Sequence, residues 1–238
     1  MIGSGEVIGV APAPEYHFHI LVTPVGPYFK GGLKPIKLCV SKYDRAAPHG
    51  TGNIKAGLNY AMSLKPTMEA HRAGFAENLY LDSESRTFVE ETGGANVMFV
   101  TEDGELVVPQ SHTDSILPSI TRRSLVQVAE DLGLTVTQRP VEWAEVKSGK
   151  FVECGLCGTA AVISPVGEIH DGEEVVHFPN HCPQKKKRNA WRGARWAIAM
   201  PKIRRRRSWD PRRAHRSSSF TISQSIYISF SIFSLKLS

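Results

Sequence analysis

The stretch HGTGNIKAGLNY, residues 49–60, is the part of the sequence around which the rest is organised. Gly50 and Gly52 permit a turn in which the backbone takes positive φ or approaches a ligand closely. Lys55 follows, in the first turn of a helix if one opens just before it, and Tyr60 adds a hydroxyl that can bond a phenolic or carbonyl oxygen. A partly desolvated lysine loses its proton more easily, and the neutral amine can attack a carbonyl group. From this stretch alone, a solvated lysine beside a glycine-rich turn is the alternative.

Two further motifs carry candidate polar groups. Glu90 and Glu91 precede Gly93 and Gly94, and because neighbours in a strand face opposite sides, one of the two carboxylates would face a site. A solvated pair on an edge strand is the alternative. Ser119 stands just before an amphipathic segment, and the free N–H groups and dipole of a helix start form an anion site. There the alternative is that Ser119 serves only as an N-cap.

Apolar periodicity predicts strands interleaved with helices. A loop is expected over residues 1–15, and the sequence EDGE at 102–105 is typical of a hairpin turn. After the helix near Lys55, Pro66 is expected to start another, which ends near Gly74. Since there is neither a regular βαβ alternation nor a GxGxxG motif, the pattern indicates a mixed α/β or α+β fold and not a Rossmann fold. Strands are predicted at residues 16–23, 35–41, 79–81, 87–89, 97–101, 106–108, 135–138, 151–154 and 160–166, and further helices at 121–132 and 141–146.

The charge of the chain is unevenly distributed. Residues 1–183 carry 14 Lys and Arg against 22 Asp and Glu, a net charge of −8, whereas residues 184–238 carry 15 against 1, a net charge of +14. The second segment joins KKKR (185–188) and RRRR (204–207) to a Ser-rich end, and it shares no apolar period with the first. We expect it to be disordered or to derive from a frameshifted or misjoined reading frame. A basic arm that binds nucleic acid through Arg204–Arg207, with salt-sensitive affinity, is the alternative.

Four cysteines in 238 residues do not indicate a disulfide framework. Cys154 and Cys157 form a CxxC pair, which together with His181 and Cys182 could hold zinc or act in redox chemistry. No second CxxC follows at zinc-ribbon spacing, so both are interpreted as packing residues and no metal is expected. The sequence has neither a signal-peptide pattern at its start nor an apolar run of about 18 residues, so we expect a cytoplasmic protein with no membrane span.

Four motifs follow one another along the chain: YDRAAPHGTGNIKAGLNYAMSL, VEETGGANVMFV, LPSITRRSL and CGTAAVISPVGEI. Together they resemble the larger domain of branched-chain amino acid aminotransferases, in the fold-type IV class of pyridoxal-phosphate enzymes. The resemblance implies a mixed-sheet pseudo-barrel with flanking helices over residues 16–183, which would be the pyridoxal-phosphate-binding large domain. Residues 1–15 would be a remnant of the interdomain connection and residues 184–238 an unrelated tail. A counterpart of the family's N-terminal small domain is not expected.

The resemblance also implies roles for particular residues around pyridoxal 5'-phosphate, which acts as an electron sink. Lys55 would form the Schiff base with it and shuttle the α-proton of the substrate. Glu91 would stand beside the pyridine nitrogen, and Tyr60 would bond the ring oxygen. Gly94, like Gly93, would let the backbone pass close to the ring. Contacts to the phosphate are implied for Arg45, Ile120, Thr121 and Thr159, and contacts to the substrate carboxylate for Ala160 and Ala161.

These roles imply transfer of an amino group between Leu, Ile or Val and 2-oxoglutarate by a ping-pong route, in a family whose full-length members are homodimers. A D-amino acid aminotransferase or an aminodeoxychorismate lyase is the alternative within the class. In the family, the small domain completes the phosphate site and the substrate wall. A fragment that binds cofactor without turnover is therefore a second alternative, and a basic nucleic-acid-binding protein is the alternative from another class.

Overall fold

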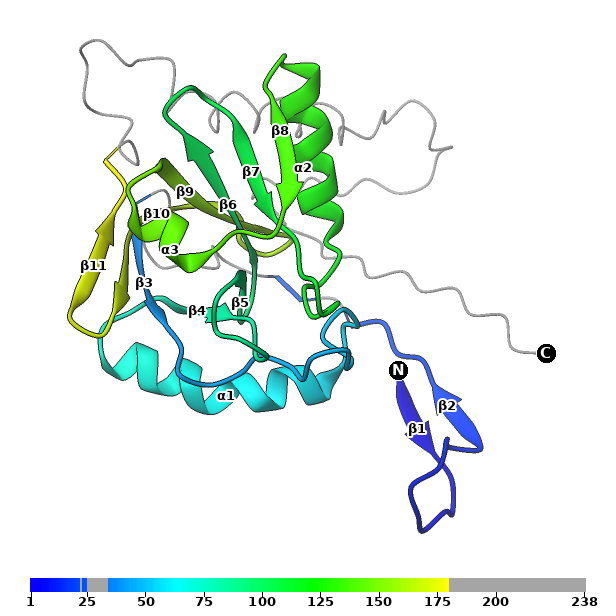
Figure 1. Ribbon diagram of the computed structural model, residues 1–238. Coiled ribbons are helices and arrows are strands. Elements are labelled where there is room, and N and C mark those ends of the chain that lie inside the picture. Colours follow the sequence, from blue (N-terminus) through cyan, green and yellow to red (C-terminus); the bar gives the residue numbers. More distant parts are fainter. Residues whose placement is uncertain (22, 25–33, 180–238) are drawn as a thin grey trace. The chain divides into compact units, whose positions relative to one another are not determined.

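The computed structural model describes residues 1–21, 23–24 and 34–179 (Figure 1), which fall into two compact units. In the first unit, β1 (Ile2–Ser4) pairs antiparallel with β2 (Glu15–His17). Part of the loop expected over residues 1–15 is therefore a strand. The strand expected over 16–23 ends at His17. Alternating residues show that a segment can form a strand, but a strand also needs a hydrogen-bonded neighbour. The pairing with β1 ends at His17, and so does the strand.

The second unit is built on a mixed sheet. Among residues 34–179, the strand order is β11-β10-β3-β4-β5-β6-β7-β8, and β9 pairs with both β10 and β6. This double pairing closes β10, β3, β4, β5, β6 and β9 into a ring, which confirms the predicted pseudo-barrel (Figure 1). The strands are β3 (Ile36–Val40), β4 (Glu77–Leu81), β5 (Val89–Thr92), β6 (Asn96–Thr101), β7 (Leu106–Pro109), β8 (Val136–Arg139), β9 (Phe151–Gly158), β10 (Val162–Asp171) and β11 (Glu174–His177).

Three helices lie among these strands: α1 (Gly57–Arg72), α2 (Ile120–Asp131) and α3 (Trp143–Lys147). The predicted division of the first helical region was wrong. One helix begins at Gly57, after Lys55, and continues through Pro66 to Arg72. Proline weakens a helix interior by removing one N–H donor. Here Pro66 lies buried on the side of α1 that packs on β4, and this tertiary packing holds the helix together.

The core has two parts, one on each face of β6. Val97 and Phe99 join a cluster that draws residues from all six strands of the ring, and Phe99 stacks on Phe151 with centroids 4.8 Å apart. Met98 and Val100 join the second cluster, which packs under α2. Because both faces of β6 are buried, its sequence NVMFVT is apolar without alternation.

The CxxC pair is divided between these two clusters. Cys154 lies in the first cluster and Cys157 in the second, since residues three apart in a strand face opposite sides. Burial raises the pKa of both thiols, that of Cys157 to about 12. The two side chains therefore cannot chelate one ion together, and they pack as small apolar groups. Their suggested partners, His181 and Cys182, lie outside the described residues.

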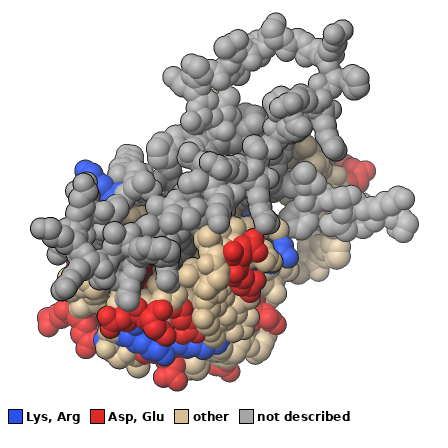
Figure 2. Space-filling model, turned by 90° about the horizontal axis from the view of Figure 1, so that it is seen from above, with Lys and Arg blue, Asp and Glu red and all other residues tan. Residues whose placement is uncertain are grey.

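The described surface is acidic in character. Figure 2 shows Asp and Glu side chains gathered on the visible part of one face, as the net charge of residues 1–183 predicts. No helix of the described residues is long and apolar enough to cross a membrane. The basic tail predicted over 184–238, with its nucleic-acid alternative, lies outside the described residues.

Candidate active site

The segment before α1 carries Lys55 and is fastened to the helix by Asn59. The Asn59 amide donates to the carbonyls of Thr51 at 2.7 Å and Ile54 at 2.9 Å. Lys55 itself is exposed, and its Nζ lies 3.2 Å from the hydroxyl of Tyr60. The two side chains expected at the cofactor therefore lie side by side, but Lys55 precedes the helix and does not stand in its first turn as expected. Sequence reasoning missed Asn59, whose signal is an amide side chain beside a turn with carbonyls to satisfy.

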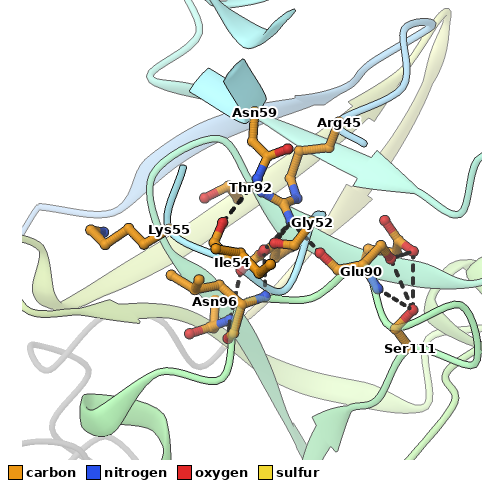
Figure 3. A network of polar contacts seen from close by, with 12 residues as sticks. Arg45, Gly52, Ile54, Lys55, Asn59, Glu90, Thr92, Asn96 and Ser111 are labelled. Atoms are coloured by element: carbon orange, nitrogen blue, oxygen red, sulfur yellow. Dashed lines mark hydrogen bonds and ion pairs between the residues drawn. The ribbon is translucent and has the colours of Figure 1, made fainter. Parts of the chain in front are cut away.

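A buried carboxylate lies in the β5–β6 hairpin, whose residues Thr92 and Asn96 are labelled in Figure 3. Glu91 in β5 lies opposite Asn96 in β6, and its Oε2 accepts from the Asn96 amide at 2.7 Å. Its Oε1 accepts from the Leu117 N–H at 2.8 Å and lies 2.9 Å from Arg45 Nη2. Both Glu90 and Glu91 are buried, so a solvated pair on an edge strand is excluded.

The environment of Glu91 sets its ionisation. Burial raises the pKa of this carboxyl to about 7, although Arg45 and the Leu117 N–H both act to lower it. The neighbouring Glu90 raises the pKa of Glu91 further, and Arg122 lowers it. A carboxylate offers about four acceptor positions, and the donors named here fill three of them. One acceptor position is left for a further donor.

Arg45 links this carboxylate to the segment that carries Lys55. Its Nη2 donates to the Gly52 carbonyl at 2.6 Å and to the Ser115 carbonyl. The two segments touch so closely that a Cβ on Gly52 would stand 2.5 Å from the Ser115 oxygen, which explains the glycine. The buried Nε of Arg45 has no hydrogen-bond partner in the part of the chain that the structure describes.

The start of α2 has the form of an anion site. Ser119 is the N-cap predicted from the sequence, and its hydroxyl accepts from the Arg122 N–H at 3.2 Å. The other amides of a first helical turn have no partner within the helix. Ile120 is exposed and Thr121 is buried, and the turn contains their backbone N–H groups and the Thr121 hydroxyl.

The turn before β6 and the turn after β9 lie side by side, because the two strands are antiparallel. The register pairs Asn96 with Cys157, and a Cβ on Gly158 would stand 3.6 Å from the Gly94 carbonyl. The Thr92 hydroxyl ties its own turn by donating to the Ala95 carbonyl at 2.8 Å. The other turn follows Gly158, and in it Thr159 and Ala160 are exposed whereas Ala161 is buried.

The family described as amino-transferase class IV matches residues 2–169. The chain belongs to this family. It is 47% identical over 180 residues to a branched-chain-amino-acid aminotransferase of Haemophilus influenzae, covering 73% of this chain and 51% of that protein. It is 45% identical over 181 residues to the branched-chain-amino-acid aminotransferase of Helicobacter pylori, covering 75% and 52%. The chain thus spans about half the length of the curated relatives it matches.

Solved structures of relatives show the same fold. The branched-chain amino acid aminotransferase of Thermobaculum terrenum, in its PLP-form, superposes with a TM-score of 0.60 at 30% identity, covering 73% of this chain and 52% of that one. This similarity agrees with the closed ring of strands described above.

The structure brings the predicted residues together in groups. Lys55 meets Tyr60, Glu91 meets Arg45, and the turn of Gly94 lies beside the turn that follows Gly158. Figure 3 shows the Lys55 side chain pointing away from the Arg45 guanidinium. Among the described residues, Arg45 pairs with the Glu91 carboxylate and forms no hydrogen bond with Thr121 or Thr159. Sequence reasoning missed the 111–117 loop, which holds Arg45 and Glu91 through Ser115 and Leu117.

Proposed function

We propose that the chain is the cofactor-binding part of a pyridoxal-phosphate-dependent branched-chain aminotransferase. Such an enzyme exchanges an amino group between Leu, Ile or Val and 2-oxoglutarate. The observation that carries the proposal is the buried Glu91 carboxylate, held by Arg45, Asn96 and the Leu117 N–H with one acceptor position left. The names of the relatives and their identity to this chain support the choice of substrates.

The residues present fit pyridoxal phosphate by their chemistry. The cofactor needs an amine, a carboxylate for its ring nitrogen, a hydrogen-bond partner for its ring oxygen and an anion site. Lys55 offers an exposed amine and Tyr60 a hydroxyl 3.2 Å away. Glu91 offers the carboxylate, and the first turn of α2 offers backbone N–H groups with the Thr121 hydroxyl.

When bound, pyridoxal phosphate supplies an electron sink for the carbanion that forms when the α-proton leaves the substrate. Lys55 can accept and return that proton with its amine. Glu91 can hold a proton at the ring nitrogen, and a carboxyl whose pKa is raised to about 7 shares a proton readily with a pyridine. Arg45 keeps the carboxylate in place, and Tyr60 orients the lysine amine through their hydrogen bond.

The remaining predicted residues are assigned to the two ends of the bound molecules. The N–H groups of Ile120 and Thr121 and the hydroxyl of Thr159 would hold the phosphate. The backbone of Ala160 and Ala161 would hold the substrate carboxylate, beside the turn of Gly94. A phosphate role for Arg45 remains a prediction, because in the structure its guanidinium pairs with Glu91.

A homodimeric, cytoplasmic protein is part of the proposal. Helix α1 supports association because its buried residues are small or polar, whereas four large apolar side chains lie exposed among Lys65, His71 and Arg72. Exposed apolar side chains of this kind favour cover by another surface. The buried residues of α1 are Asn59, Ser63, Pro66 and Ala70, whereas Leu58, Met62, Leu64 and Met68 are exposed.

The test is an absorbance spectrum of the purified chain with pyridoxal phosphate, recorded before and after borohydride. We expect a new band in wild type that borohydride converts to a covalent adduct, and peptide mass analysis should place the adduct on Lys55. The variant Lys55→Ala should lack both, and Lys65→Ala, which removes an exposed lysine of α1, should keep both. Equal spectra for wild type and Lys55→Ala would contradict the proposal.

A further inference from the structure

The loop over residues 111–117 follows β7 and contacts both glutamates of β5. Glu90 is buried, and its Oε1 accepts from the hydroxyls of Ser111 at 3.3 Å, Thr113 at 3.3 Å and Ser115. These hydroxyls also lie within hydrogen-bond distance of one another, so they can exchange partners, with Ser111 Oγ 3.0 Å from Thr113 Oγ1 and 2.9 Å from Ser115 Oγ. One buried carboxylate oxygen is thus the common hydrogen-bond acceptor of three hydroxyls of a single loop.

The backbone of the same loop holds the Glu91 site. The Ser115 carbonyl accepts from Arg45, and the Leu117 N–H donates to Glu91 at 2.8 Å. The Thr113 carbonyl accepts from the His49 N–H at 2.9 Å, and His49 belongs to the segment that carries the cofactor lysine. The loop therefore binds Glu90 through its side chains, and it binds Arg45 and Glu91 through its backbone.

We propose that Glu90 is a positioning residue for Glu91: by holding three hydroxyls it fixes the loop whose Ser115 carbonyl and Leu117 N–H clamp Arg45 and Glu91. The physical reason is that hydrogen bonds to a charged acceptor are stronger than bonds between neutral hydroxyls. Without the carboxylate, the three hydroxyls would lose the acceptor that they share and could bond only one another, so the loop would be held less firmly and would open more often to water. The consequence for the cofactor rests on the proposed function, whereas the holding of the loop does not.

Charge and hydrogen bonding at Glu90 can be separated by substitution. Glutamine keeps an acceptor for the three hydroxyls and removes the negative charge, whereas alanine removes both. The charged groups that change the pKa of Glu91 are Arg45 before α1, Arg122 in α2 and Glu90 itself. Glu91 in turn raises the pKa of the Cys157 thiol in β9. Of these, only Glu90 is changed in the test.

The test is amide hydrogen exchange of the chain without cofactor, read at Leu117. We expect exchange at Leu117 to become at least about tenfold faster in Glu90→Ala, because the loop that places this N–H is released. Glu90→Gln should restore exchange to within about threefold of wild type. Ser115→Ala, which removes one of the three contacts, should accelerate exchange by no more than Glu90→Ala does. The double variant should exchange no faster than Glu90→Ala alone, since alanine at position 90 already removes the contact with Ser115.

The matched control is Glu77→Ala. Glu77 is a buried glutamate of β4 that accepts from the Asn78 N–H at 3.0 Å and from the backbone N–H of Gly94, and among the described residues it has no hydrogen bond to the loop. It should leave exchange at Leu117 unchanged. A folded Glu90→Ala protein with wild-type exchange at Leu117 would overturn the proposal, as would an equal acceleration by Glu77→Ala, which would indicate general loosening.

A spectroscopic readout with cofactor separates this proposal from the proposed function. In Glu90→Gln the pH midpoint of the bound-cofactor band should fall, because a negative charge that raises the pKa of Glu91 is gone. If wild type gives no such band, the proposed function fails while the exchange experiment still decides the role of Glu90. If wild type gives the band and Glu90→Ala leaves Leu117 protected, only the positioning role fails.

Discussion

Replacing Glu91 by glutamine tests the burial of this carboxyl through the pH dependence of folding. An ordinary glutamate has a pKa of 4.5, and in the folded chain burial raises the pKa of Glu91 to about 7. Between these values the folded chain keeps a proton that the unfolded chain releases. The contribution of Glu91 to stability is therefore complete below pH 4.5 and is lost as the pH rises through 7.

The magnitude follows from the width of that interval. Each pKa unit corresponds to about 1.4 kcal/mol, so Glu91 removes about 3 kcal/mol of unfolding free energy between pH 4.5 and pH 8. Glutamine does not titrate. The free energy of unfolding of Glu91→Gln minus that of wild type should therefore increase by about 3 kcal/mol over this range. A constant offset from the altered contact with Arg45 does not affect the slope.

The assay is urea denaturation at a series of pH values, with the same m-value for both proteins as the check on two-state unfolding. Glu168→Gln is a control in which the stability difference from wild type should change with pH in the opposite direction. Hydrogen bonds from Lys37 and His170 lower the pKa of Glu168, so its stabilisation is present at neutral pH and lost as the pH falls. A difference between Glu91→Gln and wild type that stays flat from pH 4.5 to 8 would refute the reasoning.

Two further substitutions test the contacts around this carboxyl. Arg45→Met should lower the unfolding free energy by about 3–5 kcal/mol at pH 8, because it leaves a buried carboxylate without its cation; adding Glu91→Leu should recover part of the loss in the same urea assay. Gly52→Ala should cost about 1–3 kcal/mol, because its Cβ would stand 2.5 Å from a backbone oxygen of the 111–117 loop. Gly57→Ala, where a Cβ meets nothing within 4 Å, is the matched control, and equal losses for both glycines would contradict this explanation.

Several parts of the fold could be predicted from local sequence. The amphipathic period and the Ser119 cap predicted α2 to within one residue at each end, since both signals lie inside the segment itself. The EDGE hairpin between β6 and β7 was predicted for the same reason, and Gly104 takes φ 92° in that turn. At Pro66 local reasoning failed, because packing of α1 on the sheet outweighed the preference of proline for a helix start.

The sequence by itself determined the family and the chemistry of the candidate residues, because motifs such as HGTGNIKAGLNY fix residue types at fixed spacings. The tertiary structure alone decided which groups meet. Closure of the ring depends on β9 pairing with both β6 and β10. Likewise, Glu91 meets Arg45 and a loop from elsewhere in the chain. Periodicity states which face of an element is buried but does not name its partner, and these contacts are set by pairing between segments far apart in sequence.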